Sequence, residues 1–174
     1  YPKSSISETD ILSSEIGFQQ ALNGAYAQMA TRNLYGDNLS MGFVSALAQN
    51  YNTVALGFIF LETAGLNYET SEVRDRANAI WSNSYKVIAG LNNILINIDA
   101  KEGDFSGDNY ALIKAEALGL RAYLHFELLR LFAGTPTNSP EAIALPYRKE
   151  INALSQRPSS VQEFINSALA DLQE

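Results

Sequence analysis

The sequence predicts an all-α protein: about five to six helices in tetratricopeptide-like hairpins around one enclosed helix near residues 109–133. Apolar residues recur every three or four positions over most of the 174-residue chain, and the alternation typical of β-strands is absent. Within 113–132 the apolar residues point in almost every direction around a helix, which indicates a helix covered by others. Five charges interrupt that segment, so it does not resemble a membrane span.

The first two helices are expected over residues 14–32 and 39–51. Ser13 or Ser14 suits the first N-cap, and Glu15 lies where the helix dipole favours an anion. The apolar stripe of the first helix is expected to contain Ile16, Leu22, Ala25, Tyr26 and Met29. That of the second contains Phe43, Val44, Leu47 and Tyr51. A turn is expected at 36–38, and glycines interrupt the segment 53–69.

A long third helix is expected over 71–99, about 40 Å in length. A Gly/Asp-rich linker follows at 101–109, with Asp108 or Ser106 as the N-cap of the enclosed helix. After a proline-containing loop at 134–158, a last helix begins at Ser159 or Ser160. Its stripe comprises Val161, Phe164, Ile165, Ala168, Leu169 and Leu172. Short turns favour helical hairpins, although no exact 34-residue repeat is visible.

Composition excludes several classes of function. The chain has the length of one domain, 1–174, with a sizeable core. Its net charge of −7 argues against binding to nucleic acid or to an anionic membrane surface. It has no cysteine, so disulfides, zinc–thiolate sites and thiol catalysis are excluded. Because it begins at Tyr1 and ends within a predicted helix, we expect it to be a piece of a longer protein.

Four blocks of sequence resemble, in order, the amino-terminal part of the SusD/RagB family. The first has Trp81, Tyr85, Ile88 and Asn92 at the spacing of one family helix. The second joins Ala115-Glu116-Ala117 to Arg121-Ala122-Tyr123 and Phe126-Glu127-Leu128, and the third runs from Leu131 to Pro136. The last comprises Leu145-Pro146, then Arg157-Pro158-Ser159-Ser160-Val161, then Asp171-Leu172. Ala115 and Ala133 depart from this pattern, since the family usually has glycine at both positions.

Members of that family are surface lipoproteins that work with TonB-dependent transporters in glycan uptake. The resemblance implies a non-catalytic protein that captures an oligosaccharide and passes it to a SusC-like transporter. It further implies the extracellular face of the outer membrane, with a lipid anchor upstream of Tyr1, and no cofactor. Whether the cargo is a sugar or a peptide stays open, and the family pattern transfers no specific binding residue.

Candidate ligand contacts come instead from the residue types. A sugar is held by exposed aromatic rings beside amide and carboxylate side chains, often on loops carried by rigid helices. Such residues occur at the predicted turns, namely Tyr35, Asp37, Asn38, Asn50, Tyr51 and Tyr68. The alternative is that these residues only form turns and half-buried packing.

The remaining singled-out residues are expected to have structural roles. Glu116 and Arg121 should pair with neighbouring helices or loop carbonyls, because a buried charge needs a partner. His125, the single histidine, suits a satisfied core position better than a metal or triad. Trp81 suits core packing, although indoles also stack on sugars.

The acidic linker around 99–108 lacks the ligand spacing of an EF-hand, so a solvated loop is expected there rather than a calcium site. No nucleophile motif or phosphate-binding loop is present, and we predict no metal site. Two alternatives to glycan capture remain. One is a helical adaptor that binds only other proteins, and the weaker one is a polysaccharide-cleaving enzyme.

Overall fold

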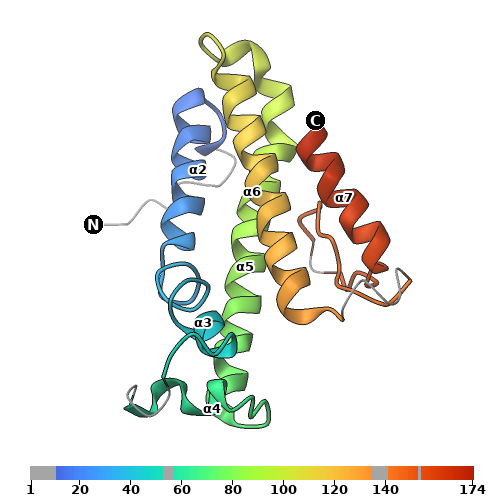
Figure 1. Ribbon diagram of the computed structural model, residues 1–174. Helices are drawn as coiled ribbons and strands as arrows, with labels where there is room; N and C mark the ends of the chain where they lie inside the picture. The colour runs from blue at the N-terminus through green and yellow to red at the C-terminus, as the bar shows by residue number, and fades with distance from the viewer. Residues whose placement is uncertain (1–10, 53–56, 135–140, 153) are drawn as a thin grey trace. The chain divides into compact units, whose positions relative to one another are not determined.

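The computed structural model describes residues 11–52, 57–134, 141–152 and 154–174 (Figure 1). Within these ranges the secondary structure is helical, with one isolated antiparallel bridge between Ile143 and Ser160. The elements are α2 (Glu15–Met29), α3 (Phe43–Leu47), η1 (Gly57–Phe60), α4 (Leu61–Ala64), α5 (Ser71–Ile98), η2 (Asp99–Asp104), α6 (Asn109–Phe132) and α7 (Val161–Gln173). The all-α prediction is confirmed.

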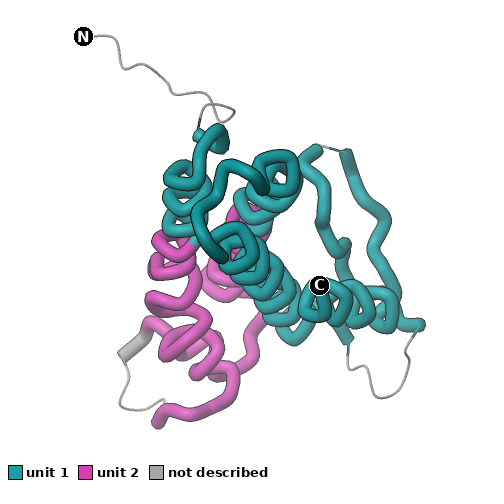
Figure 2. The backbone as a smooth tube through the Cα atoms, turned by 90° about the horizontal axis from the view of Figure 1, so that it is seen from above, with its two compact units in different colours: residues 1–25, 88–174 teal, residues 26–87 magenta. Residues whose placement is uncertain are grey.

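The chain forms two compact units (Figure 2). Unit 1 comprises Tyr1–Ala25 and Ile88–Glu174, and unit 2 comprises Tyr26–Val87. Helices α2 and α5 each lie partly in unit 1 and partly in unit 2. The two units are described separately below.

In unit 1, α6 packs along α7 and is tied to the start of α2. The Glu15 carboxylate accepts hydrogen bonds from the Ser106 backbone N–H at 2.8 Å and from the Asn109 side chain at 2.6 Å. These bonds, the Ser106 N–H first, hold the pKa of Glu15 below its usual value. The buried core of this unit includes Phe18, Leu22, Leu91, Ile94, Ile98, Ile113, Ala117, Leu124, Leu128 and Phe164.

The start of α2 is as predicted, but its buried face is not. The backbone N–H of Gly17 donates to the Ser14 hydroxyl, which makes Ser14 the N-cap. Phe18 is fully buried, whereas Ile16 is exposed, so the predicted stripe was wrong at Ile16. Tyr26 is also exposed. The helix therefore turns Phe18 inward, where its ring lies 5.3 Å from that of Phe105.

In unit 2 the predicted helix over 39–51 is wrong in length, because α3 spans only Phe43–Leu47. Residues 31–40 form consecutive turns, as the 36–38 signal indicated. At Gly42, just before α3, a side chain would clash with Asp37. After α3, Gln49 has a positive φ of 55°, which ends the helix. Phe43 is buried as expected, and the rest of its predicted stripe is half-buried.

Helix α5 begins at the predicted residue, Ser71, and ends at Ile98, one residue before the predicted end at Asp99. Its buried apolar residues include Val73, Ile80, Ile88, Leu91 and Ile98. Trp81 is half-buried, and its ring lies 5.0 Å from that of Tyr85. In unit 2, Arg76 of this helix stacks its guanidinium on Phe60, 4.6 Å from the ring centre.

Helix α6 begins and ends where predicted, but it is not enclosed on every side. Ile113, Ala117, Leu118, Ala122, Leu124, Leu128 and Leu129 are buried together with Arg121, His125 and Glu127. The opposite face, which carries Leu112, Tyr123 and Phe126, is exposed. Glu116 lies on that exposed face, so the premise that its charge is buried was wrong. Asp108 occupies the N-cap position without a side-chain capping bond.

Helix α7 starts with a complete capping box. The Ser160 hydroxyl accepts from the Glu163 N–H, and the Glu163 carboxylate accepts from the Ser160 N–H. Of the two predicted starting residues, Ser159 and Ser160, the structure selects Ser160 as the N-cap. The buried face was partly mispredicted, because Leu169 and Leu172 are exposed while Asp171 is buried.

Candidate functional site

A buried ion pair joins α6 to α7 and supports the loop between them. The Arg121 guanidinium donates two hydrogen bonds to the Asp171 carboxylate, at 2.7 Å from Nε and 2.8 Å from Nη2. Its remaining Nη1 donates to the Asn92 side-chain oxygen at 3.0 Å. The predicted pairing of Arg121 is therefore confirmed, with a partner on the next helix. Such a two-point contact fixes the relative position of both side chains.

Two loop residues complete the cluster around the same carboxylate. The Tyr147 hydroxyl donates to Asp171 at 2.7 Å, and the Lys149 ammonium lies 2.9 Å away. Burial raises the pKa of Asp171, but the hydrogen bonds from Arg121, Tyr147 and Lys149 outweigh it and leave that pKa below its usual value. Burial and the bond to Asp171 raise the pKa of Tyr147. Asp171 is therefore ionised and Tyr147 protonated at neutral pH.

His125 fastens the same loop from the core of α6. Its Nε2 accepts from the Arg148 backbone N–H at 3.0 Å, so its Nδ1 carries the proton and donates to the Arg121 carbonyl at 2.9 Å. The imidazole stacks on the Tyr147 ring, with centres 3.9 Å apart. Burial lowers the pKa of His125 to about 4. The prediction of a satisfied core histidine is confirmed.

Further bonds hold the described parts of the loop at Arg148, Asn152 and Leu154. The Asn92 amide donates to the Arg148 carbonyl at 3.0 Å. The Arg148 guanidinium in turn donates to the carbonyls of Leu154 at 2.9 Å and Asn152 at 2.6 Å. Arg148 therefore links Tyr147 and Lys149, its neighbours in the chain, to the part of the loop at Asn152 and Leu154.

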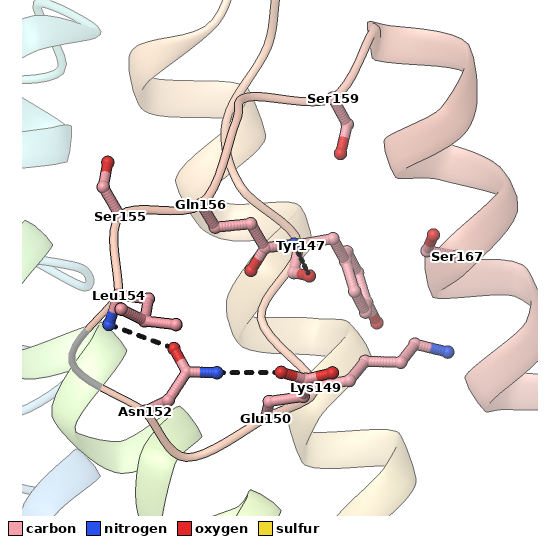
Figure 3. Close-up of a pocket in the computed structure, with 9 residues that line it drawn as sticks. All are labelled: Tyr147, Lys149, Glu150, Asn152, Leu154, Ser155, Gln156, Ser159 and Ser167. Atoms are coloured by element: carbon pink, nitrogen blue, oxygen red, sulfur yellow. Dashed lines mark hydrogen bonds between the residues drawn. The ribbon is translucent and has the colours of Figure 1, made fainter.

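This loop and α7 line an open polar pocket of about 460 Å³ (Figure 3). Its lining residues are Tyr147, Lys149, Glu150, Asn152, Leu154, Ser155, Gln156, Ser159 and Ser167. Figure 3 shows Ser159 and Ser167 on the α7 side, facing Lys149 and Gln156 across the space. The volume falls in the range of small-molecule sites. Hydroxyl, amide, ammonium and carboxylate groups together supply donors and acceptors, as a hydroxyl-rich ligand requires.

Neither the pocket nor its residues were predicted from the sequence, apart from the motif residue Arg157 nearby. Arg157 lines a second, open pocket of about 600 Å³ with Glu141, Ile143 and the start of α7. Among the described residues no three His, Asp or Glu side chains are grouped as a metal site would need. None of the described helices has the length and apolar character of a membrane span.

The sequence-predicted ligand residues all lie in unit 2. Asn38 is buried and bonds to the Asn33 carbonyl and to Arg76, and the Tyr51 hydroxyl donates to the Met41 carbonyl. Asp37 pairs with Arg32 at 3.6 Å, and Tyr35 is half-buried.

Asn50 and Tyr68 are exposed. They keep side-chain surface available to a ligand, whereas Asn38 and Tyr51 act within the fold. Ligand binding by all six residues stays a prediction.

The other motif residues divide by burial. Asn92 is fully buried and bonds to Arg121, whereas Tyr123 is exposed on α6. Pro136 lies outside the described residues. Asn92 and Asp171, the two side chains that the Arg121 guanidinium binds, thus both belong to the sequence blocks that resemble the family.

Comparison with known proteins agrees with this architecture. The SusD-like family described as "Starch-binding associating with outer membrane" matches residues 2–174. The chain therefore belongs to this SusD-like family. It is 27% identical over 160 residues to SusD-like protein P2 of Formosa agariphila, a match that spans 89% of this chain and 29% of that protein.

Two solved structures share the fold. A SusD superfamily protein from Bacteroides fragilis superposes with a TM-score of 0.74 at 22% identity, over 95% of this chain and 39% of that one. A SusD-like carbohydrate binding protein from Bacteroides vulgatus gives a TM-score of 0.68 at 21% identity, over 92% and 34%. This chain thus spans about a third of the length of these relatives.

Proposed function

We propose that this chain is the amino-terminal helical part of a non-catalytic glycan-binding protein of the outer membrane. The observation that carries the proposal is the family match along residues 2–174, in a family described as starch-binding and associated with the outer membrane. The name of the B. vulgatus protein, a carbohydrate binding protein of the same fold, supports the same ligand class. The protein captures an oligosaccharide and releases it unchanged.

The polar pocket between the 147–159 loop and α7 is our first candidate for a saccharide contact. Its lining includes the Glu150 carboxylate and the Ser155 hydroxyl, and the buried Asp171 carboxylate holds two other lining residues, Tyr147 and Lys149. Tyr147 is buried and bonded, so it offers no stacking surface, and binding here rests on hydrogen bonds. The exposed Asn50 and Tyr68 in unit 2 form the second candidate, where the Tyr68 ring can stack on a sugar.

The proposal further includes delivery of the glycan to a TonB-dependent, SusC-like transporter. It also includes a lipid anchor that holds the protein on the extracellular face of the outer membrane. Co-purification of the full-length protein with the transporter encoded beside it tests the partner. A helical adaptor would co-purify in the same way but would bind no glycan, so the two functions separate in the binding assay.

The test of capture is a glycan array followed by titration calorimetry with the full-length protein. We expect saturable binding without cleavage products. Glu150→Gln and Ser155→Ala each remove one polar contact and should weaken binding about 3- to 10-fold if the pocket is used. Asn50→Ala and Tyr68→Ala test the unit 2 surface in the same way, and Glu102→Gln on the exposed η2 is the control. The proposal would be refuted if the full-length protein bound none of the glycans on the array.

A further inference from the structure

Two fully buried polar side chains bind the backbone of a single loop residue, Arg148. The His125 Nε2 on α6 accepts from the Arg148 N–H at 3.0 Å, and the Asn92 amide on α5 donates to the Arg148 carbonyl at 3.0 Å. Both side chains belong to residues that are 0% exposed. The neighbours of Arg148 in the chain, Tyr147 and Lys149, bind a buried carboxylate on α7 through their side chains. Three helices therefore hold three consecutive loop residues.

The outer part of the loop, residues 150–152 and 154–156, is attached to this anchored segment. The Arg148 guanidinium donates to the carbonyls of Asn152 and Leu154. The Gln156 amide donates to the Tyr147 carbonyl at 3.2 Å. The remaining hydrogen bonds of these described residues stay within the outer part, so none of them reaches a helix directly. The position of the outer part is therefore passed on from the helices through residues 147–149.

Five of the nine residues that line the polar pocket belong to this outer part, and all five are exposed. Hydrogen bonds between exposed groups compete with water and contribute little each. The outer part therefore depends on the anchors that water does not reach. A site that binds through hydrogen bonds gains affinity when its donors and acceptors are held in place before the ligand arrives.

We propose that His125 and Asn92 are positioning residues of the polar pocket, which set its affinity for a saccharide by holding Arg148. The inference rests on the proposed use of this pocket by a saccharide. Neither residue lines the pocket, so both act through the loop and not on the ligand. Without their bonds the loop would take several positions, and only the fraction of molecules with the lining residues in place would bind. A fraction of about one tenth would weaken binding about 10-fold.

Calorimetric titration of full-length variants with an oligosaccharide selected on the array tests the affinity. His125→Leu removes the acceptor for the Arg148 N–H and should weaken binding about 10-fold, whereas His125→Gln offers a new acceptor and should restore most of it. Asn92→Asp keeps an acceptor for Arg121 but loses the donor to Arg148, and should also weaken binding about 10-fold. Phe18→Ala is the control for lost stability, because it removes a buried ring on α2 and should leave the affinity unchanged.

Hydrogen exchange of the same full-length variants tests the anchoring without a ligand. The Arg148 amide should exchange at least about 10-fold faster in His125→Leu than in the unmodified protein, and His125→Gln should slow it again. Unchanged exchange in His125→Leu would overturn the inference.

Ser155→Ala separates this inference from the proposed use of the pocket. If Ser155→Ala weakens glycan binding but His125→Leu and Asn92→Asp do not, the positioning role is wrong and the pocket remains the saccharide site. If a glycan binds and Ser155→Ala, Glu150→Gln and His125→Leu all leave its affinity unchanged, the pocket is not the saccharide site and the positioning role falls with it.

Discussion

The Arg121–Asp171 pair should be the most sensitive point of unit 1 to a small chemical change. Asp171→Asn keeps the size of the side chain but removes the negative charge that faces Arg121. The Arg121 and Asp171 side chains are only 7% and 1% exposed, so the guanidinium left behind cannot be hydrated by water. Removal of one partner of a buried pair costs about 3–5 kcal/mol. We therefore expect the free energy of unfolding to fall by about this amount.

The assay is urea unfolding followed by circular dichroism. With a slope of about 2 kcal/mol per molar urea, the midpoint should move down by roughly 2 M. Lys101→Met is the control in the same unit, because Lys101 pairs with Asp104 and the two side chains are 42% and 56% exposed. Such a pair contributes at most about 1 kcal/mol. The double variant Arg121→Met/Asp171→Asn should recover part of the loss, since no charge stays buried alone.

The reasoning would be refuted if Asp171→Asn lost no more stability than Lys101→Met. That result would mean that Arg121 finds other acceptors at no cost, and that the pair does not hold α7 against α6. A larger loss in the double variant than in Asp171→Asn would equally contradict the argument about the unpaired charge.

Three further changes test other parts of the fold. His125 has a pKa of about 4 in the folded chain against 6.5 unfolded, so the free energy of unfolding should fall by about 3 kcal/mol as the pH drops from 6.5 to 4. Chemical denaturation at several pH values in this window should show a smaller change in the free energy of unfolding for His125→Gln. Ser160→Ala removes the capping box with Glu163 and should cost about 1 kcal/mol by urea unfolding, whereas Ser160→Asp should restore most of it. Phe18→Ala should lower the free energy of unfolding by about 3–5 kcal/mol and Ile16→Ala by less than about 0.5 kcal/mol. The apolar stripe predicted from the sequence, which contained Ile16 but not Phe18, gives the opposite order.

Element positions were predictable where local signals are strong. The bounds of α5 and α6 follow from long apolar periods, and the start of α7 follows from Ser160 after Pro158. The expected helix over 39–51 failed because Gly42 must remain without a side chain beside Asp37 and because Gln49 reverses the backbone. Both features depend on local geometry that periodicity does not contain.

Which face of a helix is buried depends on partners far away in the sequence. Asp171 lies inward because Arg121, fifty residues earlier, brings a charge into the core, and Leu172 is then turned outward. The sequence contained one signal for this pair, because Arg121 and Asp171 each place a charge within a largely apolar helix. The pocket had no such signal, because its loop takes its shape from Asn92, His125 and Arg148, which meet only in the folded chain.

The most direct test of the central claim is calorimetric titration of the full-length protein with the glycans selected on an array. The account predicts saturable heat for at least one oligosaccharide, recovered chemically intact when the mixture is analysed by mass spectrometry. Failure of every glycan to give saturable heat, or the appearance of shorter saccharides after incubation, would contradict it.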